Sequence, residues 1–183
     1  MYIIHCMRQS LNQKGFTLIE LLVVISVIGF LAAASLVVFN NARINARNVK
    51  RLADIRQVIK ALELYYDANS RYPDGDGDGC GGWDTGNQDY PLLTNGGVSK
   101  LGQFMPKPPR DATATGNCSG YRYYRYSAGS SGCDVSKGAF YIIMVSMEGG
   151  TDNIYPGSPG FSCPSRNWQT EASYDWVTGG FEN

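Results

Sequence analysis

Residues 14–39 read KGFTLIELLVVISVIGFLAAASLVVF, and this stretch decides the organisation of the chain. From Phe16 onward its only charged residue is Glu20. As an α-helix, residues 16–39 would be ~36 Å long at ~1.5 Å per residue, which is enough to cross a hydrocarbon core of ~30 Å. The stretch therefore predicts a membrane-spanning helix with a single carboxylate near its start.

The helix is expected to continue beyond this apolar stretch, because no proline lies between Phe16 and Tyr72. Over residues 40–72, apolar and charged side chains recur on different sides at three- and four-residue steps. The apolar set is Leu52, Ile55, Ile59, Leu62 and Tyr66, and the charged set is Arg56, Lys60, Glu63 and Asp67. The pattern predicts an amphipathic second half that ends near Asn69, before Pro73, since proline disfavours helix in the preceding residue.

Residues 73–183 form a Gly-rich region, because all glycines except Gly15 and Gly29 lie beyond Pro73. Aromatic and β-branched runs bounded by Gly, Ser or Asp predict strands. The two best candidates are Tyr121–Tyr126 and Ala139–Met147, a weaker third is Tyr174–Val177, and the least convincing is Tyr90–Leu93. We expect an α+β fold in which a small antiparallel sheet packs on the amphipathic half of the helix and buries Ile55, Ile59 and Leu62.

Composition argues against several classes of function. The formal net charge is zero, so bulk attraction to nucleic acid is not indicated. The basic residues of Arg43–Arg56 are read as a solvated helix face touching lipid headgroups or acidic patches of neighbouring subunits. Because the only histidine is His5, His-dependent triads and most zinc sites are excluded from the rest of the chain. Tyr121, Tyr123, Tyr124 and Tyr126 are expected in the core or on the surface, and no enzymatic activity is predicted.

Four cysteines follow the apolar stretch, namely Cys80, Cys118, Cys133 and Cys163, while Cys6 precedes it. An even number of cysteines behind a membrane segment indicates disulfides formed in an oxidising compartment. Four cysteines allow three pairings, and spacing does not choose among them.

An acidic loop, DGDGDG, follows Pro73. It places Asp74, Asp76 and Asp78 at positions 1, 3 and 5 of an EF-hand-like calcium loop, with the carbonyl of Cys80 as a further oxygen ligand. Position 12 is Thr85 in place of glutamate. A calcium site and a solvated Asp/Gly turn are both open interpretations, and no cofactor is required.

The string GFTLIE followed by a continuous apolar run resembles the signal of type IV prepilins and pseudopilins. The resemblance implies that residues 1–15 are a leader, with Met7 an alternative start, and that a prepilin peptidase cuts between Gly15 and Phe16 and methylates the new Phe16 amine. It also implies that Glu20 faces the Phe16 amine of a neighbouring copy in the filament.

A second stretch, Asp54–Tyr66 followed by Asn69 and Arg71-Tyr72-Pro73, resembles the end of the long helix of pilins and of the major pseudopilin of type II secretion. The chain departs from many members at Val37, where a proline often interrupts the helix, so a family-style kink there is in doubt. Gly29, a poor helix former, is the remaining position where the helix could bend.

These residues predict a pilin, a structural subunit of an extracytoplasmic filament at the cell surface or in the envelope. Its partners would be copies of itself or related pilins, the membrane, the prepilin peptidase and an inner-membrane assembly platform. One alternative is the major pseudopilin of type II secretion. Another is a membrane-tethered or secreted module that binds calcium or a ligand.

Two further patterns oppose parts of this prediction. Ala32-Ala33-Ala34 fits cleavage of an ordinary secretory signal, which would leave a mature chain starting near Ser35. The basic residues Arg43, Arg47, Lys50 and Arg51 follow the apolar stretch, and by the positive-inside tendency they favour a cytoplasmic C-terminal part. The cysteines and the leader pattern both favour export, and we give them more weight.

Overall fold

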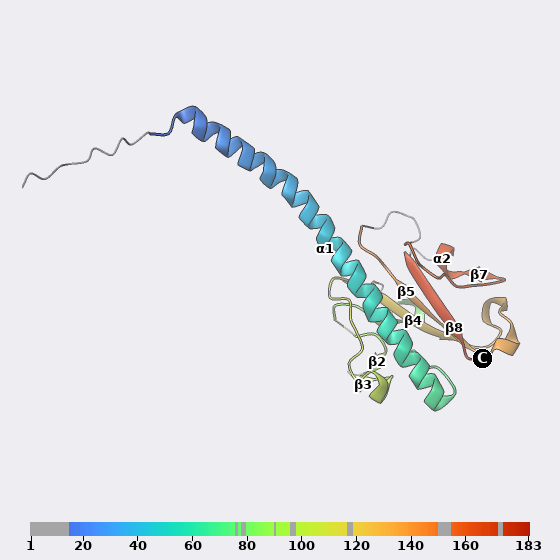
Figure 1. Cartoon of the computed structure of the whole chain (residues 1–183). Helices are drawn as coiled ribbons and strands as arrows, with labels where there is room; N and C mark the ends of the chain where they lie inside the picture. Colours follow the sequence, from blue (N-terminus) through green and yellow to red (C-terminus); the bar gives the residue numbers. More distant parts are fainter. Residues whose placement is uncertain are drawn as a thin grey trace, which may run out of the picture. The chain divides into compact units, whose positions relative to one another are not determined.

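The computed structural model describes residues 15–183 except 76, 78–79, 90, 96–97, 117–118, 150–154 and 172–173, and omits the side chains of 37, 80 and 171. A long helix, α1, is followed by short strands, turns and one more short helix (Figure 1). Residues up to Arg43 and residues from Ile44 onward form two units, and each is described by itself.

Helix α1 spans Leu18–Asn69, 52 residues, and passes through Gly29. It begins two residues after Phe16 and ends where the sequence predicted. The end has a local cause, because Ser70 adopts a left-handed conformation with φ of 54° and its N–H donates to the Tyr66 carbonyl at 2.7 Å. The Asn69 side chain also donates to the Tyr65 carbonyl at 2.8 Å.

The main sheet has four antiparallel strands in the order β1-β4-β5-β8. Its strands are β1 (Asp84–Gly86), β4 (Tyr121–Tyr126), β5 (Phe140–Val145) and β8 (Trp176–Phe181). Strand β4 has the predicted bounds, and β5 lies within the predicted Ala139–Met147. The α+β architecture predicted from the sequence is therefore confirmed.

Two strand predictions need correction. The third strand, β8, runs two residues later at its start and four later at its end than the predicted Tyr174–Val177, because Gly179 and Gly180 lie inside it. A Cβ on Gly179 would lie 2.5 Å from the Tyr141 carbonyl oxygen, so close packing against β5 requires glycine at this position.

The expected strand at Tyr90–Leu93 is wrong over its described residues, Pro91–Leu93. Leu92 and Leu93 lie in a turn, and Leu93 has a φ of 55°. The Leu92 N–H donates to the Pro109 carbonyl at 2.9 Å, and the Leu93 N–H donates to the Asp84 carboxylate at 2.7 Å. These backbone groups are therefore satisfied by a loop and a side chain in place of a strand ladder.

Alternate residues of β5 face two different cores, and all six are buried. Tyr141, Ile143 and Val145 belong to a core that also contains residues of α1, namely Ile55, Val58, Ala61 and Leu62. Phe140, Ile142 and Met144 belong to a second core, which also contains Trp83, Cys133, Trp168 and Val177. The first core was predicted from the amphipathic pattern, and the second was not.

Short elements complete the domain. Two small hairpins pair β2 (Thr94–Asn95) with β3 (Val98–Ser99) and β6 (Ser162–Cys163) with β7 (Arg166–Asn167). Helix α2 spans Trp168–Glu171. Four single 3₁₀ turns lie at Cys80–Gly82, Gly102–Phe104, Ser130–Gly132 and Val135–Lys137.

Candidate assembly site

The start of α1 holds the carboxylate of Glu20 in a defined position. Thr17 is the residue before the helix, and Glu20 is the third residue inside it. The Thr17 N–H and hydroxyl both donate to Glu20 Oε2, at 2.8 Å and 2.7 Å, and the Glu20 N–H donates to Thr17 Oγ1 at 3.3 Å. This reciprocal pair is a capping box, in which each side chain satisfies a backbone N–H of the first turn.

The capping box changes the interpretation of Glu20. Sequence reasoning treated the carboxylate as lacking any partner in its own chain, but one of its oxygens accepts two hydrogen bonds from Thr17. Its other oxygen, Oε1, accepts none from the part of the chain that the structure describes. Sequence analysis missed the capping role of Thr17, although a T-x-x-E pattern before an apolar run is typical of a capping box.

Beyond Glu20, the described side chains of residues 21–39 are all apolar or small, and they point outward. Every described residue of 16–39 is exposed in the single chain, for example Leu18 at 89% and Phe30 at 75%. The two serines in this segment are satisfied locally, since Ser26 Oγ donates to the Leu22 carbonyl and Ser35 Oγ to the Leu31 carbonyl. A continuous apolar surface of this size requires lipid or other protein chains around it.

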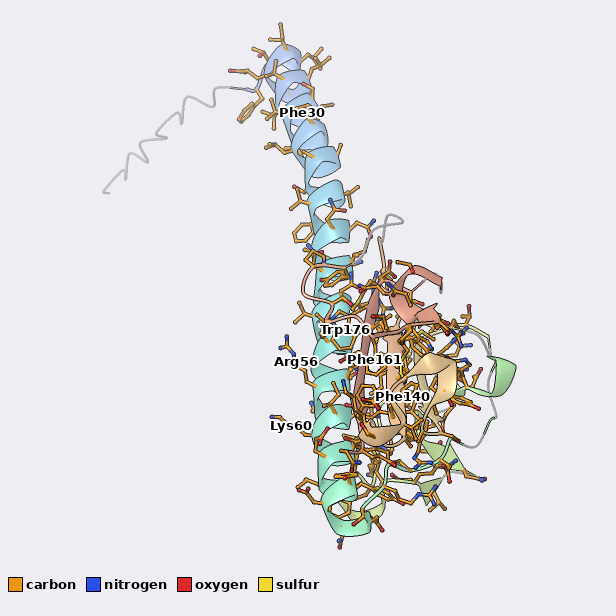
Figure 2. All side chains as sticks on the ribbon, turned by 90° about the vertical axis from the view of Figure 1, so that its right-hand side faces the viewer. Phe30, Arg56, Lys60, Phe140, Phe161 and Trp176 are labelled. Atoms are coloured by element: carbon orange, nitrogen blue, oxygen red, sulfur yellow. A yellow bond between two sulfur atoms is a disulfide. The ribbon has the colours of Figure 1, made fainter. Side chains whose placement is uncertain are left out.

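Among the described residues, α1 alone is long and apolar enough to cross a membrane, judged by its length and composition. This agrees with the prediction of a membrane-spanning segment. The Phe30 side chain lies on this part of the helix in Figure 2.

In the second unit, a network of charges ties α1 to two loops of the domain. Arg51 is 5% exposed, and its Nε donates to Asp111 Oδ2 at 2.7 Å. Its Nη2 donates to Thr113 Oγ1 at 2.6 Å and to Glu148 Oε1 at 2.5 Å. Arg47 Nε donates to the same Glu148 carboxylate at 2.7 Å.

The network holds both carboxylates in the charged form. Hydrogen bonds from the Arg47 side chain lower the pKa of Glu148 to about 2, although partial burial opposes the shift. For Asp111, burial raises the pKa, but hydrogen bonds from Arg51 and Thr113 outweigh it and lower the pKa. The same residues line part of a cleft of about 460 Å³. Arg51 therefore lies inside the domain, and its place on a solvated basic face, as read from the sequence, is wrong.

The comparisons with known proteins each cover about a third of the chain or less. The family of the prokaryotic N-terminal methylation motif matches residues 10–36, which include Gly15, Phe16, Thr17 and Glu20. The type II secretion system core protein G of Klebsiella michiganensis is 47% identical over 68 residues, covering 36% of this chain and 45% of that protein. No solved structure gives a significant match.

Two further relatives show the same pattern. Core protein G of Escherichia coli K12 is 44% identical over 69 residues, or 37% of this chain and 46% of that protein. The type IV wide pilus major component PilA4 of Thermus thermophilus is 41% identical over 61 residues, or 33% and 47%. The methylation motif and these relatives support a relationship to the type IV pilin and pseudopilin family. It spans less than half of the length of each of these curated relatives.

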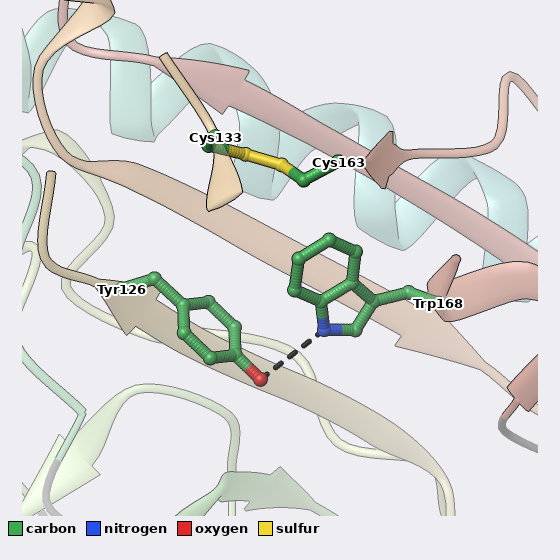
Figure 3. The surroundings of a disulfide bond; sticks show 4 residues. All are labelled: Tyr126, Cys133, Cys163 and Trp168. Carbon is green, nitrogen blue, oxygen red and sulfur yellow. Dashed lines mark hydrogen bonds between the residues drawn. A yellow bond between two sulfur atoms is a disulfide. The ribbon is translucent and has the colours of Figure 1, made fainter. Parts of the chain in front are cut away.

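The disulfide prediction is confirmed for one pair of cysteines. Cys133 and Cys163 are bonded across 30 residues, beside the second core (Figure 3). In the same core, Trp168 Nε1 donates to Tyr126 Oη at 3.2 Å, as the dashed line in Figure 3 shows. Closing a loop of this length stabilises a fold by about 3–4 kcal/mol in the chain-entropy model. Cys118 and the Cys80 side chain lie outside the described residues, so their pairing stays a prediction.

The acidic loop of the chain is described only in part. Asp76 and Asp78 lie outside the described residues, and Cys80 is described by its backbone alone. The Asp74 carboxylate pairs with Arg71 and with Arg125 Nη1, the latter at 3.2 Å. No cluster of three or more His, Cys, Asp or Glu able to hold a metal occurs among the described residues. Calcium binding at this loop stays a prediction.

Proposed function

We propose that the chain is a structural subunit of an extracytoplasmic type IV pilus-like filament, assembled through residues 16–39 after removal of a leader. The observation that carries this proposal is the carboxylate of Glu20, fixed in the first turn of an otherwise apolar and exposed helix segment with Oε1 open. Once lipid or other copies cover this segment, the carboxylate needs a cationic partner, because an unpaired charge in an apolar environment costs several kcal/mol.

The cation is supplied by processing of the leader. Cleavage between Gly15 and Phe16 by a prepilin peptidase creates a positively charged Phe16 amine, which the same enzyme methylates. Gly15 and Phe16 precede the helix. Among the described residues, chain neighbours aside, no heavy atom lies within 4 Å of the position of a Cβ on Gly15, which supports access of a peptidase to this peptide bond. In the filament the amine of one copy would pair with Glu20 of a neighbour, which neutralises both charges.

Before assembly, the subunit would rest in the membrane through residues 16–39 and reach the filament through an inner-membrane assembly platform. Its role is mechanical, and we infer no catalytic activity. The apolar surface of the segment suits both environments, since it is buried by lipid in the first state and by other copies in the second.

The same reasoning supports a second assembly, the short envelope filament of type II secretion. Core protein G of that system and a pilus major component each match about a third of the chain. Labelling the native cell surface with an antibody against residues 73–183, followed by electron microscopy, separates the two. Labelled surface filaments support the pilus, and label confined to the envelope supports the pseudopilin.

The capping box makes a sharper mutational test available. Thr17→Ala removes the capping hydroxyl and keeps the carboxylate, whereas Glu20→Gln keeps the size of the side chain and removes its charge. If Glu20 acts by charge pairing with another copy, Glu20→Gln will lower filament yield about tenfold or more. Thr17→Ala will lower it much less, because loss of a cap costs only about 1 kcal/mol.

Mass spectrometry of the mature chain provides the control for this test. Wild type and both variants should begin at an N-methylated Phe16, which shows that processing is intact. Equal filament yields from Glu20→Gln and wild type, with normal processing, would contradict the charge-pairing proposal. A mature wild-type chain starting near Ser35 would instead indicate a secretory signal and remove the filament proposal altogether.

A further inference from the structure

The cleft beside Arg51 is lined by three separate segments of the second unit. Arg47 and Arg51 come from α1, several residues within 111–120 come from the loop before β4, and residues 146–148 directly follow β5. Its volume of about 460 Å³ is roughly fifteen times the ~30 Å³ share of a water molecule in the liquid. The cleft therefore has room for a ligand of several heavy atoms.

The carboxylates of the cleft are already engaged by the chain itself. Glu148 Oε1 accepts from Arg51 Nη2 at 2.5 Å and from Thr113 Oγ1 at 3.2 Å. Glu148 Oε2 accepts from Arg47 Nε at 2.7 Å. The Asp111 carboxylate accepts from Arg51 Nε at 2.7 Å and from the Thr113 N–H at 3.0 Å. Two guanidiniums thus offset two carboxylates, and the charges that line the cleft sum to zero.

The groups that remain unused in the cleft are hydrogen-bond donors. Arg47 uses Nε and Nη2 on Glu148, and its Nη1 donates to no group in the described part of the chain. The hydroxyls of Thr115 and Ser146 also line the cleft, and neither makes a hydrogen bond to another described residue. Nη1 carries two N–H groups, and each hydroxyl carries one O–H. These groups favour a negatively charged ligand with several acceptor oxygens.

A phosphoryl group meets this requirement better than a carboxylate does. Its oxygens point in several directions, whereas the two oxygens of a carboxylate share one plane. The unused donors belong to three different segments, with Arg47 on α1, Thr115 in the loop before β4 and Ser146 after β5. A hydrogen bond from a guanidinium to a phosphoryl oxygen is also strong, because both partners are charged.

The length of chain between the cleft and the apolar segment indicates where such a group would come from. Arg47 follows Phe39 by eight positions within α1, which is ~12 Å of helix. The polar headgroup layer of a bilayer extends roughly 5–7 Å beyond each side of the ~30 Å hydrocarbon core. Lipid headgroups are therefore the phosphoryl-bearing molecules nearest to the cleft while the subunit resides in the membrane.

We propose that this cleft binds the phosphodiester group of a membrane phospholipid through Arg47 Nη1 and the hydroxyls of Thr115 and Ser146. A bound headgroup would hold the second unit at the membrane surface, and it would be released when the subunit enters a filament. The inference rests on the membrane-resident stage of the proposed function. It adds a ligand to that stage and the residues that bind it.

Titration of the full chain in a maltoside detergent, which contains no phosphate, tests the proposal. The two probes are water-soluble dihexanoyl phosphatidylglycerol and inorganic phosphate, and the amide chemical shifts of the ¹⁵N-labelled chain report binding. We expect saturable shifts at cleft residues such as Gly120 and Ser146. The apparent Kd should be about tenfold lower for the lipid, because lipid held in the micelle has a high effective concentration near the apolar segment.

A double variant removes the two unused hydroxyls and leaves the ion pairs intact. Thr115→Val with Ser146→Ala should raise the Kd for the lipid about tenfold or more, since two hydrogen bonds to a charged group are lost. The matched control, Ser127→Ala with Thr170→Val, removes two exposed hydroxyls outside the cleft and should leave the Kd unchanged. A wild-type pattern of amide shifts before titration shows that each variant has folded.

The outcomes separate the site, its ligand and the proposed function. Absence of shifts at the cleft, or an unchanged Kd in the Thr115→Val and Ser146→Ala variant, would overturn the inference. Equal affinities for lipid and inorganic phosphate, both weakened in that variant, would overturn the headgroup as the ligand and assign the cleft to a free phosphate compound. The proposed function would survive each of these results, because it fails only if processed wild-type chains form no filament.

Discussion

Residues 16–39 and residues 44–69 belong to the same helix, yet their side chains meet different surroundings. In the first segment every described residue is exposed, whereas Ile55, Val58 and Leu62 of the second are fully buried. The second segment alternates apolar and charged sides, and the domain covers the apolar one. The first is apolar on all sides and finds no cover within its own unit. The comparison teaches that the apolar side chains of residues 44–69 are covered by the domain of the same chain, whereas those of residues 16–39 need lipid or further copies around them.

The largest effect on domain stability is expected at Arg51. Arg51→Ala leaves the buried carboxylate of Asp111 without its main partner, which should lower the free energy of unfolding by about 3–5 kcal/mol. The neighbouring Lys50→Ala removes only an exposed pair with Asp54 and should cost about 0.5 kcal/mol or less. Urea titration of the full chain in detergent, followed by near-UV circular dichroism, measures both. Equal effects from the two substitutions would show that the network does not hold α1 to the domain.

A matched pair of leucine substitutions compares the two halves of α1 directly. Leu62→Ala opens a cavity in the first core and should lower the free energy of unfolding by about 3 kcal/mol. Leu22→Ala makes the same chemical change at a side chain that is 62% exposed, and it should leave the domain transition unchanged. The same urea titration measures the free energy of unfolding of both variants. A comparable loss from Leu22→Ala would mean that the first segment contributes to the folded domain, and the contrast would fail.

A smaller effect is expected from pH, and it belongs to the second unit. The folded pKa of Glu148 is about 2, lowered mainly by Arg47, whereas a glutamate in an unfolded chain titrates near ~4.3. The unfolded state therefore binds more protons, so this stabilisation is present above pH ~4.3 and is lost as the pH falls through about 2. Because Glu148 is partly exposed, we expect a loss on the order of 1–2 kcal/mol.

Glu148→Gln serves as the control for this pH effect. The variant should be less stable than wild type at neutral pH, and its stability should fall less steeply between pH 4.5 and about pH 2. If the free energy of unfolding falls equally steeply with decreasing pH in both proteins, other carboxylates account for the acid sensitivity.

Sequence patterns predicted the parts of the fold that depend on local periodicity. The amphipathic repeat located the buried face of α1, and the run Tyr121–Tyr126 gave β4 its bounds. The predicted bounds of β8 were wrong because the prediction ended at Val177, before Gly179 and Gly180, whereas these glycines pack closely against Tyr141 within the strand. Close backbone approach of this kind depends on a partner strand that a local pattern does not reveal.

Two features of the site show the same contrast between local patterns, which a sequence reveals, and distant contacts, which it does not. The capping box between Thr17 and Glu20 is local and was open to prediction from its spacing, although it was overlooked. The burial of Arg51 was not, because its partners Asp111 and Glu148 lie 60 and 97 residues away. Its position four residues before Ile55, on the buried side of α1, was the available hint.

The most direct test of the account is electron cryomicroscopy of filaments purified from cells that process the leader. We predict that residues 16–39 of many copies pack together in the filament interior, with Glu20 Oε1 within hydrogen-bond distance of the Phe16 amine of a neighbouring copy. Filaments held together only by residues 44–183, or a Glu20 carboxylate paired solely with the amine of its own chain, would contradict it.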